Sequence, residues 1–212
     1  SHKPGKVIPM LELAARNSTT FYGLIASRQL GNNLDFDWSQ PALKADDLAE
    51  ISANLGIARA IALTEVSRVN QADREFSWTS RRAPPSAREA LLRLAVALNL
   101  PASQVRLARE QSRSGSDLVD AALYPIPSWI PSDGLKLDRA VLYAVMRQES
   151  NFIQHAQSHA GARGVMQLMP GTASFIARDR SLLSSKRRKL FDPEFNMSLG
   201  QKYLIYLLEK ET

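Results

Sequence analysis

Apolar residues recur every three to four positions along most of the chain, and no segment alternates apolar and polar residues as a half-buried strand would. This pattern predicts an all-α protein. Capping residues, glycine and proline set the bounds of the individual helices. The predicted helices are 18–30, ending at Gly31; 46–56 and 57–70, broken near Gly56; 86–98, opening with a Ser86–Glu89 capping box; one from Pro101; and one from Asp117 that ends before Tyr124.

Two helical domains are predicted from the way these segments follow one another. Short helices joined by short turns are typical of α-superhelical regions, so we expect a helical linker or solenoid region over 1–124. Pro125, Pro127, Pro131 and Gly134 then interrupt the helical pattern. We therefore expect a second helical domain over 125–212.

A carboxylate stands near the end of the first helix of this second domain. Asp138 is a candidate N-cap, and Leu142 and Val145 belong to the apolar face. At about 100° per residue, Glu149 projects roughly 20° from Leu142 and roughly 40° from Val145. We expect Glu149 to lie on the apolar stripe, where burial and the negative end of the helix dipole both favour its protonated form. A carboxyl group in that state can act as a general acid.

From these residues alone, an equally good interpretation of Glu149 is a structural acid. It would then form an ion pair with Arg147 or Arg163, since such pairs also place carboxylates in partly buried positions.

The residues around and after Glu149 resemble a known family, and this resemblance favours the interpretation of Glu149 as a general acid. The stretch 143–173 resembles the catalytic core of the soluble lytic murein transglycosylases, in which a helix ends in Glu-Ser and a glycine-rich turn leads into the next helix. The matching positions are Ser158, Gly161, Ala162, Gly164, Met166, Gln167, Met169, Pro170, Thr172 and Ala173, with Val165 in place of the usual leucine. Further on, Asn196, Gly200, Tyr203 and Leu204 resemble the family's Asn-x-x-x-Gly-x-x-Tyr-Leu segment.

The resemblance implies a fold and a reaction. The fold is a lysozyme-like helical catalytic domain, here partial, because the family's downstream Ala-Tyr-Asn-Ala-Gly motif does not occur before Thr212. The reaction is cleavage of the β-1,4 bond between N-acetylmuramic acid and N-acetylglucosamine, with formation of 1,6-anhydro-N-acetylmuramic acid. Glu149 would serve as the single general acid and base, where most glycosidases use two carboxylates. Reduced activity of this chain is expected if that downstream part is needed.

The resemblance also implies roles for neighbouring residues. Ser158, Gly164, Gln167 and Met169 are expected to bind the glycan: Ser158 near the muramic N-acetyl group, Gln167 by hydrogen bonding, Gly164 by close approach and Met169 by packing on a sugar face. The expected supporting residues are Ser150, Met166, Asn196 and Tyr203, with ordinary packing as the alternative for Asn196 and Tyr203. The sequence in the turn after Glu149 departs from the family, because Ile153 and Gln154 replace a frequent Asn-Pro pair.

Composition limits the remaining possibilities. The net charge of +6 fits an anionic partner, either nucleic acid or a carboxylate-bearing cell-wall polymer. We expect peptidoglycan glycan strands and no nucleic acid, with room for other cell-wall enzymes as partners. His155 and His159 lack a third ligand, so neither a metal nor a cofactor is expected. No apolar run is long enough for a transmembrane helix, and a mature periplasmic form without its signal peptide is expected.

Two other classes of function remain open from the sequence. One is a non-catalytic peptidoglycan-binding or scaffold module that retains the fold. The other is a basic helical nucleic-acid binder, although no recognition helix or aromatic platform is evident.

Overall fold

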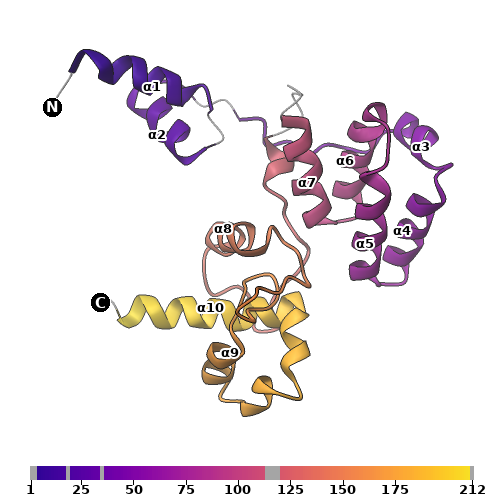
Figure 1. Ribbon diagram of the computed structural model, residues 1–212, viewed down its shortest axis with the longest axis vertical. Coiled ribbons are helices and arrows are strands. Elements are labelled where there is room, and N and C mark those ends of the chain that lie inside the picture. Colours follow the sequence, from indigo (N-terminus) through magenta and orange to yellow (C-terminus); the bar gives the residue numbers. More distant parts are fainter. Residues whose placement is uncertain (1–3, 18–19, 34–35, 113–119, 211–212) are drawn as a thin grey trace.

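The computed structural model describes residues 4–17, 20–33, 36–112 and 120–210. Within these ranges the regular structure is helical, as predicted, and extended pairing is limited to two isolated bridges within 157–168 (Figure 1). The α-helices are α1 (Val7–Ala15), α2 (Phe21–Gln29), α3 (Ala45–Ile51), α4 (Leu55–Glu65), α5 (Val69–Ser80), α6 (Arg88–Ala97), α7 (Pro101–Ser112), α8 (Arg139–Ser150), α9 (Pro170–Ala177) and α10 (Pro193–Lys210). Short 3₁₀ turns are η1 (Pro4–Lys6), η2 (Pro85–Ala87), η3 (Ala121–Leu123), η4 (Arg180–Leu183) and η5 (Arg187–Phe191).

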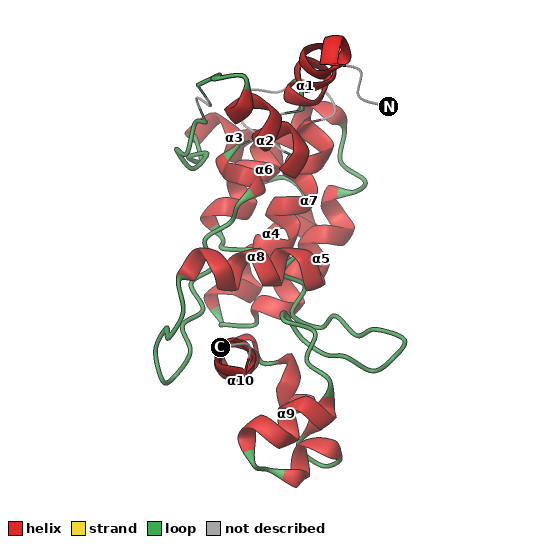
Figure 2. Ribbon diagram, turned by 90° about the vertical axis from the view of Figure 1, so that its left-hand side faces the viewer, coloured by secondary structure: helices red, strands yellow, loops and turns green. Residues whose placement is uncertain are grey.

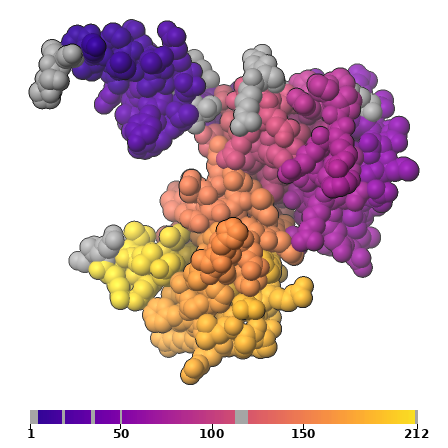
Figure 3. Space-filling view, viewed as in Figure 1, coloured from indigo at the N-terminus to yellow at the C-terminus, as the bar shows by residue number. Residues whose placement is uncertain are grey.

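Helices α1 and α2 pack against each other and stand apart from the other helices (Figures 1 and 3). Thr20 caps α2 by accepting a hydrogen bond from the Gly23 backbone N at 3.0 Å. Gly23 lies so close to the turn before α2 that an added Cβ would be 1.9 Å from the Asn17 carbonyl oxygen. The sequence predicted α2 correctly within two or three residues but missed α1.

Helices α3 to α7 form a stack with its own apolar core (Figure 2). The predicted single helix over 57–70 is wrong: α4 ends at Glu65, and α5 begins at Val69. Ser67 adopts a left-handed φ of +57°, which breaks the helix without the glycine that usually signals such a turn. The predicted cap at Ser86 is also wrong, because η2 precedes α6 and no side chain caps it. The predicted start at Asp117 lies outside the described residues.

A buried ion pair joins α3 to α6 in this stack. Arg93 donates from Nη1 to Asp47 at 2.9 Å and from Nη2 to Glu89 at 2.8 Å. The second oxygen of Asp47 accepts the Lys44 backbone N–H at 2.7 Å, which fixes the start of α3. The Arg93 and Asp47 side chains are each only 9% exposed. Removing Arg93 would leave the buried Asp47 charge without an ion-pair partner, and removing Asp47 would leave Arg93 with only Glu89, whose side chain is 47% exposed.

The C-terminal helices surround a second apolar core. Its buried residues come mainly from α8, the loop before α9, and α10, and α7 contributes Val105. The segment before α8 is fixed to α10 by Gln201, which accepts from the Lys136 backbone N and donates to the Gly134 carbonyl, both at 2.8 Å. Figure 2 shows α8 across the lower part of the helical stack in this view, with α10 and α9 at the lower end of the molecule.

Replacing Asp47 with Ala should destabilise the helical stack strongly. We expect the free energy of unfolding to fall by about 2 kcal/mol, because the buried Arg93 would keep only the partly exposed Glu89 and the Lys44 backbone N would lose its acceptor. The matched control is Glu75→Ala, which removes the surface ion pair between Glu75 and Arg59, whose side chain is 64% exposed. That change should cost less than about 1 kcal/mol. Thermal and urea unfolding would measure the loss of stability in both variants. Equal losses in Asp47→Ala and Glu75→Ala would contradict a special role for the buried ion pair.

Candidate active site

Glu149 is held by a firmly anchored helix. Asp138 Oδ1 caps α8 by accepting from the Ala140 backbone N at 2.7 Å, as the sequence predicted. Leu142 and Met146, one turn apart, are fully buried in the C-terminal core. The helix ends at Ser150 and therefore fixes the position of Glu149 in its last turn.

The side chain of Glu149 is exposed, which corrects the expectation that it lies buried on the apolar stripe. The buried row of α8 runs through Leu142, Met146 and Ser150, and Glu149 lies beside this row where the helix reaches the surface. Ser150 Oγ lies 2.7 Å from the Val165 carbonyl oxygen and 3.1 Å from that of Met146. The serine hydroxyl thus joins the end of α8 to the loop that precedes α9.

Both arginines suggested as partners for Glu149 are engaged elsewhere. Arg147 stacks over the Tyr124 ring at 4.2 Å and donates to the Leu123 carbonyl, and burial lowers the pKa of its guanidinium. Arg163 donates to Gln157 at 3.0 Å. No ion pair joins Glu149 to any residue in the described ranges. The structural ion pair is therefore not found, and the carboxylate is accessible to a ligand.

Three residues around this helix end have strained backbone conformations. Asn151 and Phe152 follow α8 with φ of +49° and +64°, and Gln167 has φ of +47°. For residues with a side chain, such conformations cost about 1 to 3 kcal/mol each and cluster at functional sites. The buried ring of Phe152, 2% exposed, helps to hold this turn. Sequence reasoning missed the strain because none of the three residues is a glycine.

Two residues predicted to bind glycan belong to the scaffold of the loop before α9. Ser158 Oγ accepts from the Ala162 backbone N at 3.0 Å. Gln167 Nε2 donates to the carbonyl oxygens of Ala156 at 3.1 Å and Gly164 at 2.9 Å. The Gln167 Oε1 atom accepts no hydrogen bond from the described residues, so it remains available to a ligand.

Asn196 of α10 connects this loop to the core. Its side chain is fully buried; it accepts from the Met166 backbone N at 2.8 Å and donates to the carbonyl oxygens of Arg163 at 3.0 Å and Leu190 at 2.8 Å. Gly164 packs against the same group: at its φ of +77°, an added Cβ would be 2.1 Å from Leu190 O and 2.4 Å from Asn196 Nδ2. A glycine is therefore required here by the protein's own packing, whatever else approaches it.

The remaining predicted residues divide into buried and exposed positions. Met166 is 5% exposed and packs against α10 so closely that a Cβ on Gly200 would be 2.2 Å from its sulfur. Tyr203 is half-buried against the C-terminal core. Met169, at the N-cap of α9, is 42% exposed and can contact a ligand.

Two further carboxylates near this region have structural partners. Asp192 accepts from the Phe195 backbone N at 2.8 Å at the start of α10, and Glu194 accepts from the Ile130 backbone N at 3.4 Å. His155 stacks on Phe191 with ring centroids 5.1 Å apart, and burial is the main cause that lowers its pKa. The described residues contain no group of three or more side chains arranged to hold a metal ion.

Comparison with known protein families gives a match to the C-terminal region only. Residues 131–211 match the family described as "Transglycosylase SLT domain". The soluble lytic murein transglycosylase of Escherichia coli K12 is 35% identical over 80 residues, which cover 37% of this chain and 12% of that protein. The membrane-bound lytic murein transglycosylase C of Klebsiella pneumoniae is 39% identical over 74 residues, which cover 34% of this chain and 20% of that protein. The matched regions therefore span a small part of these relatives.

Similarity to solved structures extends over nearly the whole chain. The 70 kDa soluble lytic transglycosylase of E. coli superposes with a TM-score of 0.73 at 21% identity, covering 98% of this chain and 33% of that one. The lytic transglycosylase Slt of Pseudomonas aeruginosa gives a TM-score of 0.65 at 25% identity, covering 96% of this chain and 33% of that one. That structure is of an inactive glutamate-to-glutamine mutant. The helical stack and the C-terminal helices thus share the fold of one third of these larger proteins.

Replacing Gly164 with Ala should unfold or distort the loop before α9. The new Cβ would meet two groups that cannot move freely, a backbone carbonyl and the buried Asn196 amide. The matched control is Gly171→Ala in α9, where nothing lies within 4 Å of the new Cβ and alanine favours the helix. Hydrogen exchange of 156–168 should rise in the first variant only; unchanged exchange in Gly164→Ala would contradict this packing.

Proposed function

Residues 131–211 belong to the transglycosylase SLT domain family, and we propose that the protein is a lytic transglycosylase that cleaves peptidoglycan. The observation that carries this proposal is the position of Glu149 at the anchored end of α8. Its carboxylate is exposed, forms no ion pair with the described residues and is followed by a strained turn. A free acid held rigidly beside a strained loop is suited to proton transfer.

Glu149 would perform both proton transfers of the reaction. In its protonated form it would donate to the glycosidic oxygen between N-acetylmuramic acid and N-acetylglucosamine as the bond to C1 breaks. The resulting carboxylate would take the proton from the muramic C6 hydroxyl while that oxygen attacks C1. The product is a 1,6-anhydro sugar, Glu149 is protonated again, and no water is consumed.

The surroundings of Glu149 support a single acid. Most glycosidases place a second carboxylate beside the first as a nucleophile or base. Here Asp192 accepts from the Phe195 backbone N at the start of α10 and Glu194 accepts from the Ile130 backbone N, so neither is a free carboxylate like that of Glu149. In this mechanism the C6 hydroxyl of the substrate replaces the second protein group.

The glycan would be held by residues of the loop before α9. Gln167 Oε1 and the exposed thioether of Met169 are the atoms available for a sugar. Ser158 would approach the N-acetyl group next to C1, and Gly164 would keep the chain path open to the glycan. Ser150, Met166, Asn196 and Tyr203 would support this loop from the core side.

The substrate also indicates where the protein works. Peptidoglycan lies outside the cytoplasmic membrane, so a periplasmic location follows from the proposed activity. None of the described helices has the length and apolar character needed to cross a bilayer.

Replacing Glu149 with Gln should abolish glycan cleavage while the fold and glycan binding persist. We expect a loss of about a thousandfold, because the amide has nearly the same shape but cannot donate and recover a proton. The matched control is Glu65→Gln, another exposed glutamate at the end of a helix, which should leave cleavage unchanged. Digestion of purified sacculi by the full-length protein measures both. A Glu149→Gln enzyme within tenfold of the unmodified protein would refute Glu149 as the acid.

The products should carry 1,6-anhydro ends, because no water takes part in the step. Mass spectrometry separates them from hydrolysis products, which are one water molecule heavier and carry reducing ends. Mainly reducing ends would indicate a hydrolase with a second catalytic carboxylate. Binding of glycan without any product would instead favour a non-catalytic peptidoglycan-binding module.

A further inference from the structure

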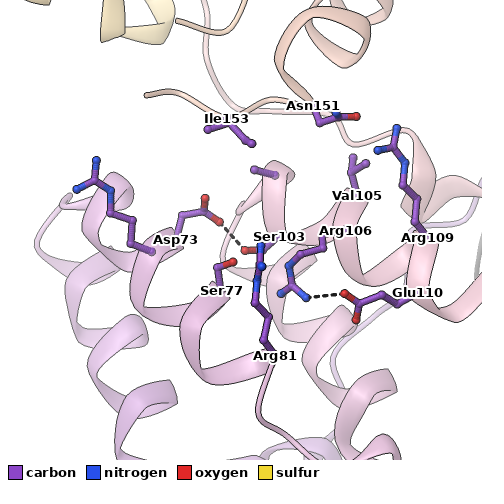
Figure 4. Close-up of a pocket in the computed structure, with 12 residues that line it drawn as sticks. Asp73, Ser77, Arg81, Ser103, Val105, Arg106, Arg109, Glu110, Asn151 and Ile153 are labelled. Carbon is purple, nitrogen blue, oxygen red and sulfur yellow. Dashed lines mark hydrogen bonds and ion pairs between the residues drawn. The ribbon is translucent and has the colours of Figure 1, made fainter. Parts of the chain in front are cut away.

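A cavity of about 470 Å³ lies between the helical stack and the chain that follows α8 (Figure 4). Helices α5 and α7 form its walls, and Asn151 and Ile153 close it from the C-terminal side. These two residues come only two and four positions after Glu149. Neither Glu149 nor any residue proposed to bind the glycan lines this cavity.

The cavity carries an excess of positive charge. Four arginines line it, against the two carboxylates of Asp73 and Glu110. Arg106 pairs with Glu110 at 3.0 Å. The other three, Arg74, Arg81 and Arg109, have no carboxylate partner in the described ranges. Several guanidinium groups around one cavity repel one another unless an anion enters between them.

Two buried polar atoms of the cavity lining also lack hydrogen-bond partners. They are Nε of Arg106, a donor, and Oδ1 of Asn151, an acceptor. Buried polar atoms are normally satisfied, so Arg106 and Asn151 each retain hydrogen-bonding capacity that a ligand could use if the side chain turns toward the cavity. Figure 4 shows Arg81 and Arg109 extending toward the segment that carries Asn151.

The acceptors restrict the kind of ligand. Asp73 faces the cavity with one oxygen accepting from Ser103 Oγ at 2.6 Å, and burial raises the pKa of its carboxyl. Inorganic phosphate presents mainly acceptor oxygens, which cannot donate to the acceptor oxygens of Asp73 and Asn151. A ligand that carries both carboxylates and N–H groups satisfies the arginines and these acceptors together.

We propose that this cavity binds a short acidic peptide, with its carboxylates on Arg81 and Arg109 and its N–H groups on Asn151 and Asp73. The volume lies within the range of small-ligand sites and accommodates two or three residues. The inference goes beyond the proposed cleavage and does not depend on it. Since Asn151 is part of the strained turn after Glu149, an occupied cavity would join the helical stack to the catalytic helix.

Isothermal titration calorimetry with the dipeptide Ala-Glu tests the proposal on this chain. We expect saturable binding that weakens about tenfold for Ala-Gln, which lacks one carboxylate, and for N-acetylated Ala-Glu, which lacks the ammonium group. Inorganic phosphate should bind more weakly than Ala-Glu. Phosphate binding as tightly as Ala-Glu, or equal binding of all three dipeptides, would overturn the assignment of a peptide site.

Substitutions of the residues that line the cavity test where Ala-Glu binds. Arg81→Gln and Arg109→Gln should each weaken Ala-Glu binding about tenfold. Asn151→Gly keeps the left-handed turn, removes Oδ1 and should also weaken binding. The matched control is Arg82→Gln: the neighbouring arginine stacks on Trp78 at 3.4 Å and does not line the cavity, so binding should stay within about twofold.

Equal losses in Arg81→Gln and Arg82→Gln would show a general charge effect and overturn the site, as would no binding of Ala-Glu at all. Because the readout is binding and not cleavage, these results are independent of the Glu149 variants.

Discussion

The side chain of Asn196 is the contact on which the candidate active site depends. One buried amide satisfies three backbone groups, two in the loop before α9 and one just before α10. These groups would otherwise be buried without partners, at a cost of about 1 to 3 kcal/mol each. Because the amide fills the space beside Gly164, only glycine fits there, and the loop can follow a single path.

The loop and the helix that carries Glu149 are in turn held together at the end of α8. Ser150 connects the last turn of α8 to Val165, one residue before the Met166 amide that Asn196 binds. Glu149 precedes Ser150 directly, so its backbone position is fixed by contacts that its own side chain does not make. A rigid frame around an exposed acid allows proton transfer without rearrangement of the protein.

The helical stack also contacts α8 and the C-terminal core. Val105 of α7 packs into the C-terminal core, and Arg147 of α8 stacks on Tyr124, which directly follows η3. The arginine-lined cavity lies along this contact and reaches Asn151. The acid and the helical stack are therefore linked through one short stretch of chain, a physical route by which a ligand in the cavity could affect the turn after Glu149.

The sequence alone determined the helical fold class, the positions of most helices and the glycine-rich loop that follows Glu149 in the chain. These features are local: capping by Asp138, the helix start at Pro101 and the motif around Gly164 depend on neighbours in the chain. The division at residue 125 and the glycan-binding roles stay predictions. Local patterns failed at Ser67, where a left-handed turn forms without glycine.

Only the tertiary structure decided the environment of each charged group. Helical periodicity placed Glu149 on the apolar face, yet the helix ends at the surface there and the carboxylate is exposed. Asp73 shows a different outcome, because its carboxyl is only partly exposed and lines the cavity beside the chain that follows α8. Spacing along one helix specifies the direction of a side chain, whereas its burial depends on which distant segment packs over it. That segment is positioned by the whole fold, and for this reason the cavity and the arginines that line it were not visible in the sequence.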